Sequence, residues 1–172
     1  NEMNSPDKFK EYLNLAPKYG IKVVPPSINR SETQFSVDNG EILYGLAAIK
    51  NVGANVVDSI IAEREKNGPY KSFMDFLSRQ GDATLNSRLV ECLIKTGCFD
   101  ELGIDRAILL ANLDEAFRYD KAQKSQSAFG QLSLFGGEEE SMLGEFEMKN
   151  ADPFPFLEKL KMEKELLGFY IS

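Results

Sequence analysis

Two tight turns, each set between short apolar helical stretches, constrain the fold more than any other feature of this sequence. In the first, residues 46–49 end a short helix, residues 50–53 form the turn, and Val56, Val57, Ile60 and Ile61 follow on one face of a second helix. In the second, a helix over residues 89–94 leads into a turn at residues 95–98, and a further helix returns from Asp105. Each turn carries Ile-Lys and a glycine shortly after it. The repeat predicts a mainly α chain with tandem helix-hairpin-helix units.

The first turn has the chemistry of a phosphate site. The N–H groups of Gly53, Ala54 and Asn55 open a helix and have no acceptor within it. They point outward with the positive end of the helix dipole, and Lys50 can add an ionic contact. A plain helical hairpin in a core explains this stretch equally well on its own.

A second copy favours the functional interpretation, because a pseudo-twofold pair of hairpins could hold both backbones of a duplex without reading bases. The residues that we expect to contact DNA are therefore those of the two turns: Lys50, Asn51, Val52, Gly53, Ala54, Asn55, Lys95, Thr96, Gly97 and Cys98.

Composition excludes several classes of protein. The chain has no histidine, which removes histidine-based catalytic triads and metal sites. Its two cysteines, Cys92 and Cys98, cannot form a disulfide framework, so we expect a cytoplasmic location. We expect Cys92 to fill the core and Cys98 to be a small turn residue. No apolar run is long enough for a membrane helix, and no membrane partner is expected. The net charge of −7 arises mostly after residue 135, which leaves the region of the turns close to neutral.

Local signals outline the remaining elements. We expect a helix from Ser5 to Gly20, a strand over residues 21–24, and a β-hairpin turning at Asp38-Asn39-Gly40. Ser72, Asn86 and Asp105 are expected helix N-caps. These signals predict a small N-terminal β element ahead of the helices.

A polar stretch rich in Gln, Ser, Gly and Glu covers residues 125–150 and is typical of a flexible linker. It contains the apolar segment Gln131-Leu132-Ser133-Leu134-Phe135, which could fold onto a partner, with Leu134 and Phe135 in a pocket. The alternative is that these side chains pack back on their own domain. Beyond the linker, a short charged helix after residue 155 and the beginning of a strand at residues 169–171 are expected.

Four blocks of sequence, in this order, resemble the alpha subunits of bacterial DNA polymerase III, the replicative C-family polymerases. They are residues 22–29 (KVVPPSIN), 45–53 (GLAAIKNVG), 85–100 (LNSRLVECLIKTGCFD) and 165–172 (ELLGFYIS). That family usually has glycine where this chain has Asn51, a residue that also tolerates left-handed backbone angles.

The resemblance implies four regions. They are the end of the fingers region over residues 1–44, a DNA-binding tandem helix-hairpin-helix module over 45–124, a linker with a clamp-binding motif over 125–150, and a helix and strand over 151–172 that lead into an OB-fold. It also implies that residues 131–135 bind the sliding clamp and that the other subunits of the holoenzyme are partners. The family's catalytic aspartates lie outside this chain, so we assign no catalytic residue, metal or cofactor here. The Mg²⁺ of polymerase chemistry belongs to the parent enzyme.

Two alternatives from other classes remain. One is a free-standing adaptor that binds the clamp, and the other is a helix-hairpin-helix scaffold of a DNA repair nuclease or ligase. The absence of an initiator methionine and the unpaired terminal strand disfavour the adaptor. The Pro25-Pro26 and Gly168-Phe169-Tyr170 blocks have no counterpart in the repair scaffolds.

Overall fold

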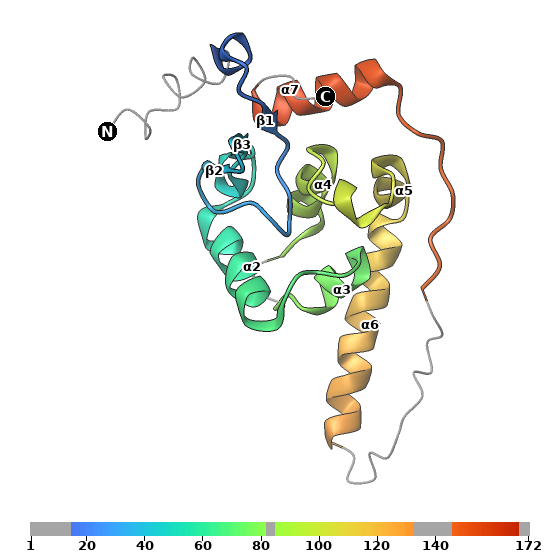
Figure 1. Cartoon of the computed structure of the whole chain (residues 1–172). Helices are drawn as coiled ribbons and strands as arrows, with labels where there is room; N and C mark the ends of the chain where they lie inside the picture. The colour runs from blue at the N-terminus through green and yellow to red at the C-terminus, as the bar shows by residue number, and fades with distance from the viewer. Residues whose placement is uncertain (1–14, 82–84, 133–145, 169–172) are drawn as a thin grey trace.

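The computed structural model describes residues 15–81, 85–132 and 146–168. Within them the chain is mainly α with one small N-terminal sheet, as the sequence predicts (Figure 1). The helix expected from Ser5 lies mostly outside these residues, and so does the strand expected at residues 169–171. The elements, in chain order, are η2 (Ala16–Tyr19), β1 (Val23–Val24), β2 (Ser36–Asp38), β3 (Glu41–Leu43), η3 (Leu46–Ala48), α2 (Ala54–Asn67), α3 (Phe73–Ser78), α4 (Ser87–Lys95), η4 (Asp100–Leu102), α5 (Arg106–Ala111), α6 (Leu113–Leu132) and α7 (Phe156–Leu167).

The predicted β-hairpin is present as β2 and β3. Asn39 and Gly40 have φ angles of 51° and 77°, and Asp38 faces Glu41 across the ladder. Positive φ at both central residues is the geometry of a type I′ turn, which Asn-Gly favours. β3 is the central strand, and β1 pairs with its other edge in parallel.

The three expected helix caps are confirmed. The side-chain oxygens of Ser72, Asn86 and Asp105 accept hydrogen bonds from backbone N–H groups at 3.0, 2.9 and 2.8 Å. The helix that starts at Asp105 is shorter than its apolar pattern suggested, because Asn112 separates α5 from α6. The Asn112 side chain instead hydrogen bonds to both the N–H and the carbonyl of Lys149, each at 2.8 Å.

One apolar core joins the helices. Phe73 and Phe76 each meet Phe99 edge to face with ring centroids 5.1 Å apart, and all three side chains are at most 1% exposed. Full burial of such a ring contributes roughly 1.5–3 kcal/mol. The aromatic cluster therefore fixes α3 against the segment that follows the second turn.

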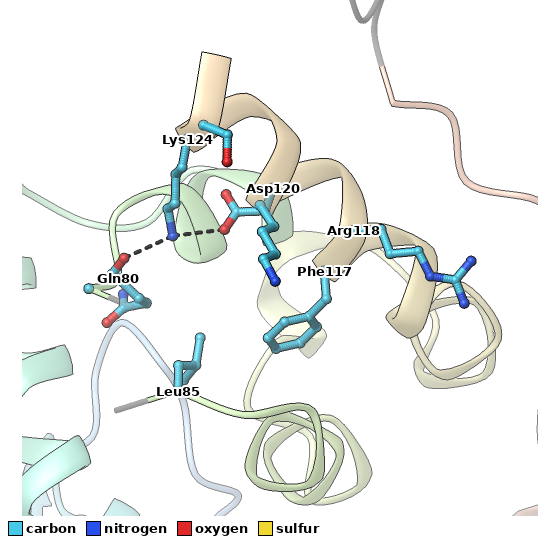
Figure 2. Close-up of a pocket in the computed structure, with 9 residues that line it drawn as sticks. Gln80, Leu85, Phe117, Arg118, Asp120 and Lys124 are labelled. Carbon is cyan, nitrogen blue, oxygen red and sulfur yellow. Dashed lines mark hydrogen bonds and ion pairs between the residues drawn. The ribbon is translucent and has the colours of Figure 1, made fainter. Parts of the chain in front are cut away.

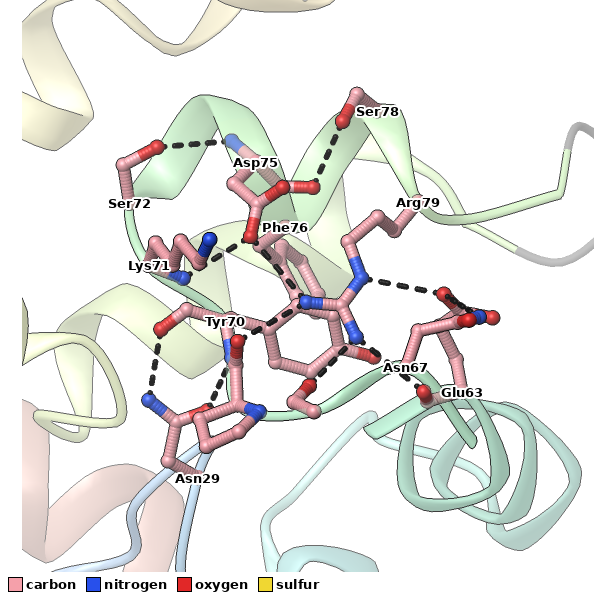
Figure 3. Close-up of polar contacts among 12 residues, drawn as sticks. Asn29, Glu63, Asn67, Tyr70, Lys71, Ser72, Asp75, Phe76, Ser78 and Arg79 are labelled. Atoms are coloured by element: carbon pink, nitrogen blue, oxygen red, sulfur yellow. Dashed lines mark hydrogen bonds and ion pairs between the residues drawn. The ribbon is translucent and has the colours of Figure 1, made fainter. Parts of the chain in front are cut away.

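Arg79 closes the joint between α2 and α3 (Figure 3). Its guanidinium donates to the carbonyls of Gly68, Pro69 and Glu63 at 2.6, 3.1 and 3.2 Å, and lies 4.3 Å from the ring centroid of Tyr70. These carbonyls lie in the last part of α2 and just beyond it, where a cation complements the negative end of the helix dipole. Arg79 thereby fixes the end of α2.

The linker expected over residues 125–150 covers fewer residues in the structure, because both ends of this range are ordered parts of the domain. α6 continues to Leu132, and Lys124 fastens it by donating to the carbonyls of Leu77 and Gln80 at 3.0 and 2.9 Å. Phe146 stacks on Tyr119 with ring centroids 5.3 Å apart. The apolar period fades after residue 121 because the last part of α6 runs beyond the body of the domain (Figure 1), where helix-favouring Ala, Lys and Gln replace core residues. Residues 133–145 lie outside the described ranges.

Candidate nucleic-acid interface

The first turn folds as the sequence predicts. η3 ends at Ala48, and Gly53 is the N-cap of α2 with an extended backbone. Asn51 has a φ of 70°, in the left-handed region that asparagine tolerates better than most residues. Val52 is 5% exposed and holds the turn on the core, whereas Lys50, Asn51 and Gly53 face solvent.

Unsatisfied backbone donors gather at this turn. The first helical hydrogen bond of α2 runs from the N–H of Val57 to Gly53, so the N–H groups of Gly53, Ala54 and Asn55 precede the ladder. Within the described ranges none of these three has an acceptor, and no side chain caps the helix. A Cβ built on Gly53 would meet nothing within 4 Å, so the site is open. Lys50 forms no ion pair with any described residue. These groups can receive a phosphate.

The second turn, whose residues were also expected to contact DNA, differs from the first in its backbone hydrogen bonds. Thr96, Gly97 and Cys98 are buried. Their N–H groups donate to the carbonyls of α4, at 3.2, 3.1 and 3.1 Å respectively. Lys95 is occupied as well, in an ion pair with Glu91 at 2.8 Å. Only the short 3-10 helix η4 follows this turn before α5 begins after Asp105, and the N–H groups of residues 96–98 are already engaged, so they are not free to bind a phosphate.

Gly97 serves a neighbouring side chain instead. It has a φ of 91°, and a Cβ there would lie 2.5 Å from Nη2 of Arg106. The Arg106 guanidinium passes over the glycine and donates to the Asp100 carboxylate at 2.8 Å and to the Lys95 carbonyl at 3.1 Å. Gly97, which was expected to contact DNA, makes room for the Arg106 side chain.

Arg106 and Glu163 were missed as site residues. Nη1 of Arg106 donates to Oε1 of Glu163 at 3.1 Å, and the two residues are 3% and 0% exposed. Burial by itself would lower the pKa of Arg106, but the hydrogen bonds and charges of Asp100 and Glu163 raise it, so the guanidinium stays charged. The available signal was the position of Glu163 three and four residues before Leu166 and Leu167, on the apolar face of α7.

The expected clamp-binding segment is only partly described. Gln131 and Leu132 form the last two residues of α6, and Ser133, Leu134 and Phe135 lie outside the described ranges. Its role remains a prediction.

A second polar area lies between α6 and the end of α3 (Figure 2). Lys124 bridges it through the two carbonyl contacts described above and an ion pair with Asp120 at 2.7 Å. Arg118 and Lys121 also line this hollow, and neither has an ion-pair partner among the described residues. The hollow is thus the place where α6 packs against the end of α3, and Arg118 and Lys121 line it as two further cations.

The described residues hold no cluster of three or more Cys, Asp or Glu placed to bind a metal ion. Cys92 and Cys98 are free thiols in the core, and burial raises the pKa of Cys98 to about 12. No helix in the described part of the chain is both long and apolar enough to span a membrane.

Comparison with known proteins gives two results. A family model described as a helix-hairpin-helix motif matches residues 20–109. The whole chain is also similar to a segment of DNA polymerase III subunit alpha, with 43% identity to the protein of Borreliella burgdorferi and 40% to that of Treponema pallidum. The protein of Thermus aquaticus is 42% identical over 99% of this chain. The chain spans about 15% of the length of the first two relatives and 14% of the third.

Proposed function

Because the chain belongs to the helix-hairpin-helix motif family, we propose that it binds the backbone of duplex DNA as a segment of a replicative DNA polymerase. The similarity of the whole chain to one segment of polymerase alpha subunits supports this context over a free-standing adaptor or a repair scaffold. Template-directed DNA synthesis, and contact with other polymerase subunits, would belong to the parent protein.

The open N-terminus of α2 is the observation that carries the proposal. Three N–H donors converge there without acceptors in the described structure, and Lys50 stands beside them. Backbone amides and a helix dipole bind phosphate without contacting base edges, so binding should be independent of sequence. The site needs no basic surface, which reconciles it with the net charge of −7.

The decisive variant is Ala54→Pro. Proline is well tolerated at the first position of a helix, and the extended backbone of Gly53 suits a following proline. The change therefore removes one of the exposed donors and leaves the helix in place. Hydrogen bonds to charged groups contribute about 1.5–3 kcal/mol, so we expect DNA affinity to fall about tenfold or more. Fluorescence anisotropy with several unrelated duplexes measures this.

Ser87→Pro is the matched control, because Ser87 is the exposed first residue of α4 and follows the extended Asn86. Equal affinities for the two proline variants would contradict the proposal. Lys50→Glu should also weaken binding and reduce its salt slope by about 0.9 per lost phosphate contact. Lys95→Glu should do less, since Lys95 already pairs with Glu91.

We further propose that residues 131–135 bind the sliding clamp. The segment places Leu134 and Phe135 among polar and glycine residues immediately after α6, where burial in a partner's pocket could contribute on the order of 1.5–3 kcal/mol per side chain. A covalent tether to the DNA-binding module would then raise the local concentration of the clamp near DNA.

The double variant Leu134→Ala, Phe135→Ala tests this. We expect calorimetry to show loss of clamp binding, with the melting temperature of the chain unchanged. Met142→Ala with Leu143→Ala removes apolar side chains from the same stretch and should bind normally. Normal clamp binding by the first double variant, or a lowered melting temperature with intact binding, would favour packing of the segment on its own domain.

We propose that the catalytic chemistry belongs to other parts of the parent protein. Polymerases transfer nucleotides with paired metals held by converging carboxylates, and the described residues contain no such cluster. The residues of this part of the chain do not fit a bound Mg²⁺, and no step of the reaction is assigned to them.

A further inference from the structure

α7 packs against α4 at one side of the hairpin module (Figure 1), and two of its residues form hydrogen bonds near the two turns. At the second turn, Glu163 accepts the hydrogen bond from Arg106, whose other donors hold Asp100 and the carbonyl of Lys95. One turn of helix further on, the carbonyl of Leu166 accepts a hydrogen bond from the N–H of Lys50 at 3.0 Å. A single helix thus joins a buried ion pair at the second turn to the backbone of the first.

The hydrogen bond from the Lys50 N–H to Leu166 lies at the start of the turn whose other end carries the open amides. The N–H of Lys50 is tied down by α7, whereas the N–H groups of Gly53, Ala54 and Asn55 remain open on the other side of the same turn. The angle at which those amides leave the turn depends on the backbone between Lys50 and Gly53. That backbone includes Asn51, at a φ of 70° that few residues adopt. A contact that holds one end of the turn therefore sets the geometry of the other.

A buried ion pair is an unusual way to attach a helix. Removing two charges from water costs several kcal/mol per ion, and apolar side chains of the same size often stabilise as well or better. What charge and hydrogen-bond geometry add is a fixed register, because the hydrogen bond between Glu163 and Arg106 forms only where the Arg106 guanidinium lies over Gly97. The apolar packing of Leu166 and Leu167 does not by itself specify one register, because the hydrophobic effect is non-directional.

We propose that Glu163 is a positioning residue for DNA binding: its ion pair with Arg106 sets the register of α7, and α7 in turn holds the first turn in the shape that presents its amides to phosphate. In this proposal the second hairpin binds α7 and does not contact DNA itself. It affects DNA binding only through the conformation of the first turn. This inference rests on the function proposed above. It implies that a movement of the segment containing α7 would change the affinity of the first turn for DNA.

Glu163→Gln tests it. Glutamine keeps the size and one acceptor oxygen but removes the charge that fixes the register. In the whole chain, labelled with ¹⁵N, we expect the amide resonances of residues 50–55 to shift and DNA affinity to fall severalfold, with a single cooperative thermal transition retained. Glu165→Gln makes the same chemical change on the exposed side of α7 and should leave both unchanged.

Resonances of residues 50–55 that stay in place in Glu163→Gln, with changes confined to the surroundings of Arg106 and Asp100, would overturn the proposal. If Glu163→Gln does not fold, Tyr44→Phe replaces it, because it removes the hydrogen bond from Tyr44 to the end of α7. Unmoved turn resonances in that variant would be equally decisive. The spectra are recorded without DNA, so they test the coupling even if Ala54→Pro shows that the turn does not bind DNA.

Discussion

The hydroxyl of Tyr44 donates a hydrogen bond of 2.7 Å to the carbonyl of Leu167, which lies 123 residues further along the chain. Tyr44 follows β3, and Leu167 is the last residue of α7, so the bond joins the N-terminal sheet to the final helix. Burial raises the pKa of Tyr44, which keeps the phenol protonated and able to donate.

Tyr44→Phe should destabilise the chain by about 1–2 kcal/mol. The change removes the hydroxyl donor, so the buried carbonyl of Leu167 loses this hydrogen bond. A buried polar group left without its hydrogen bond costs about 1–3 kcal/mol. Urea denaturation should show a lower midpoint with the same slope. Tyr19→Phe, at a side chain that is 76% exposed, is the control and should leave the midpoint in place.

Gly97→Ala should destabilise the chain more than Gly103→Ala. Both glycines have a positive φ, 91° and 83°, so both variants carry the same kind of backbone strain. Only at Gly97 would the new methyl group meet the Arg106 guanidinium, whereas nothing lies within 4 Å of a Cβ at Gly103. Strain of this kind costs on the order of 1–3 kcal/mol, and displacement of Arg106 adds to it. Thermal melts of the two variants give the comparison, and equal losses would show that Arg106 can move aside.

Asn51→Ala should cost about 1 kcal/mol, and Asn51→Gly should cost less. A left-handed backbone costs an alanine roughly 1–2 kcal/mol, asparagine tolerates it better, and glycine carries no such penalty. Chemical denaturation of both variants measures the difference. Equal losses in the two variants would indicate that the 3.8 Å contact between Asn51 Nδ2 and Cys92 Sγ, which both changes remove, matters more than the backbone.

Cys98 should make the fold less stable at alkaline pH. Burial raises its pKa from the ordinary 9.0 to about 12, so between these values the folded state holds a proton that the unfolded state has lost. The free energy of unfolding therefore falls as pH rises through this window, and the contribution is fully present below pH 9. Denaturation at pH 8 and pH 10.5 should show a smaller loss for Cys98→Ala than for the parent chain. An equal loss would assign the alkaline instability to other groups.

The local elements could be read from sequence because their causes are local. Ser72, Asn86 and Asp105 cap helices through side chains two or three residues from the N–H groups that they satisfy, and Asp38-Asn39-Gly40 bends the hairpin by its own backbone preferences. The first turn belongs to the same class, since its open amides follow from the absence of a capping side chain at Gly53. The parallel pairing of β1 with β3 has no such local signal.

The sequence by itself determined the mainly α class, the hairpin at residues 38–41, the helix caps and the open first turn, since each depends on residues a few positions apart. Only the tertiary structure decided what the second turn does. Its Ile-Lys and glycine match those of the first, yet Gly97 accommodates Arg106, and Arg106 meets a carboxylate 57 residues away on α7. It also decided how far α6 extends, through the contacts of Lys124 with α3. A glycine has the same backbone freedom wherever it occurs, and what fills the space above it depends on which distant segment packs there.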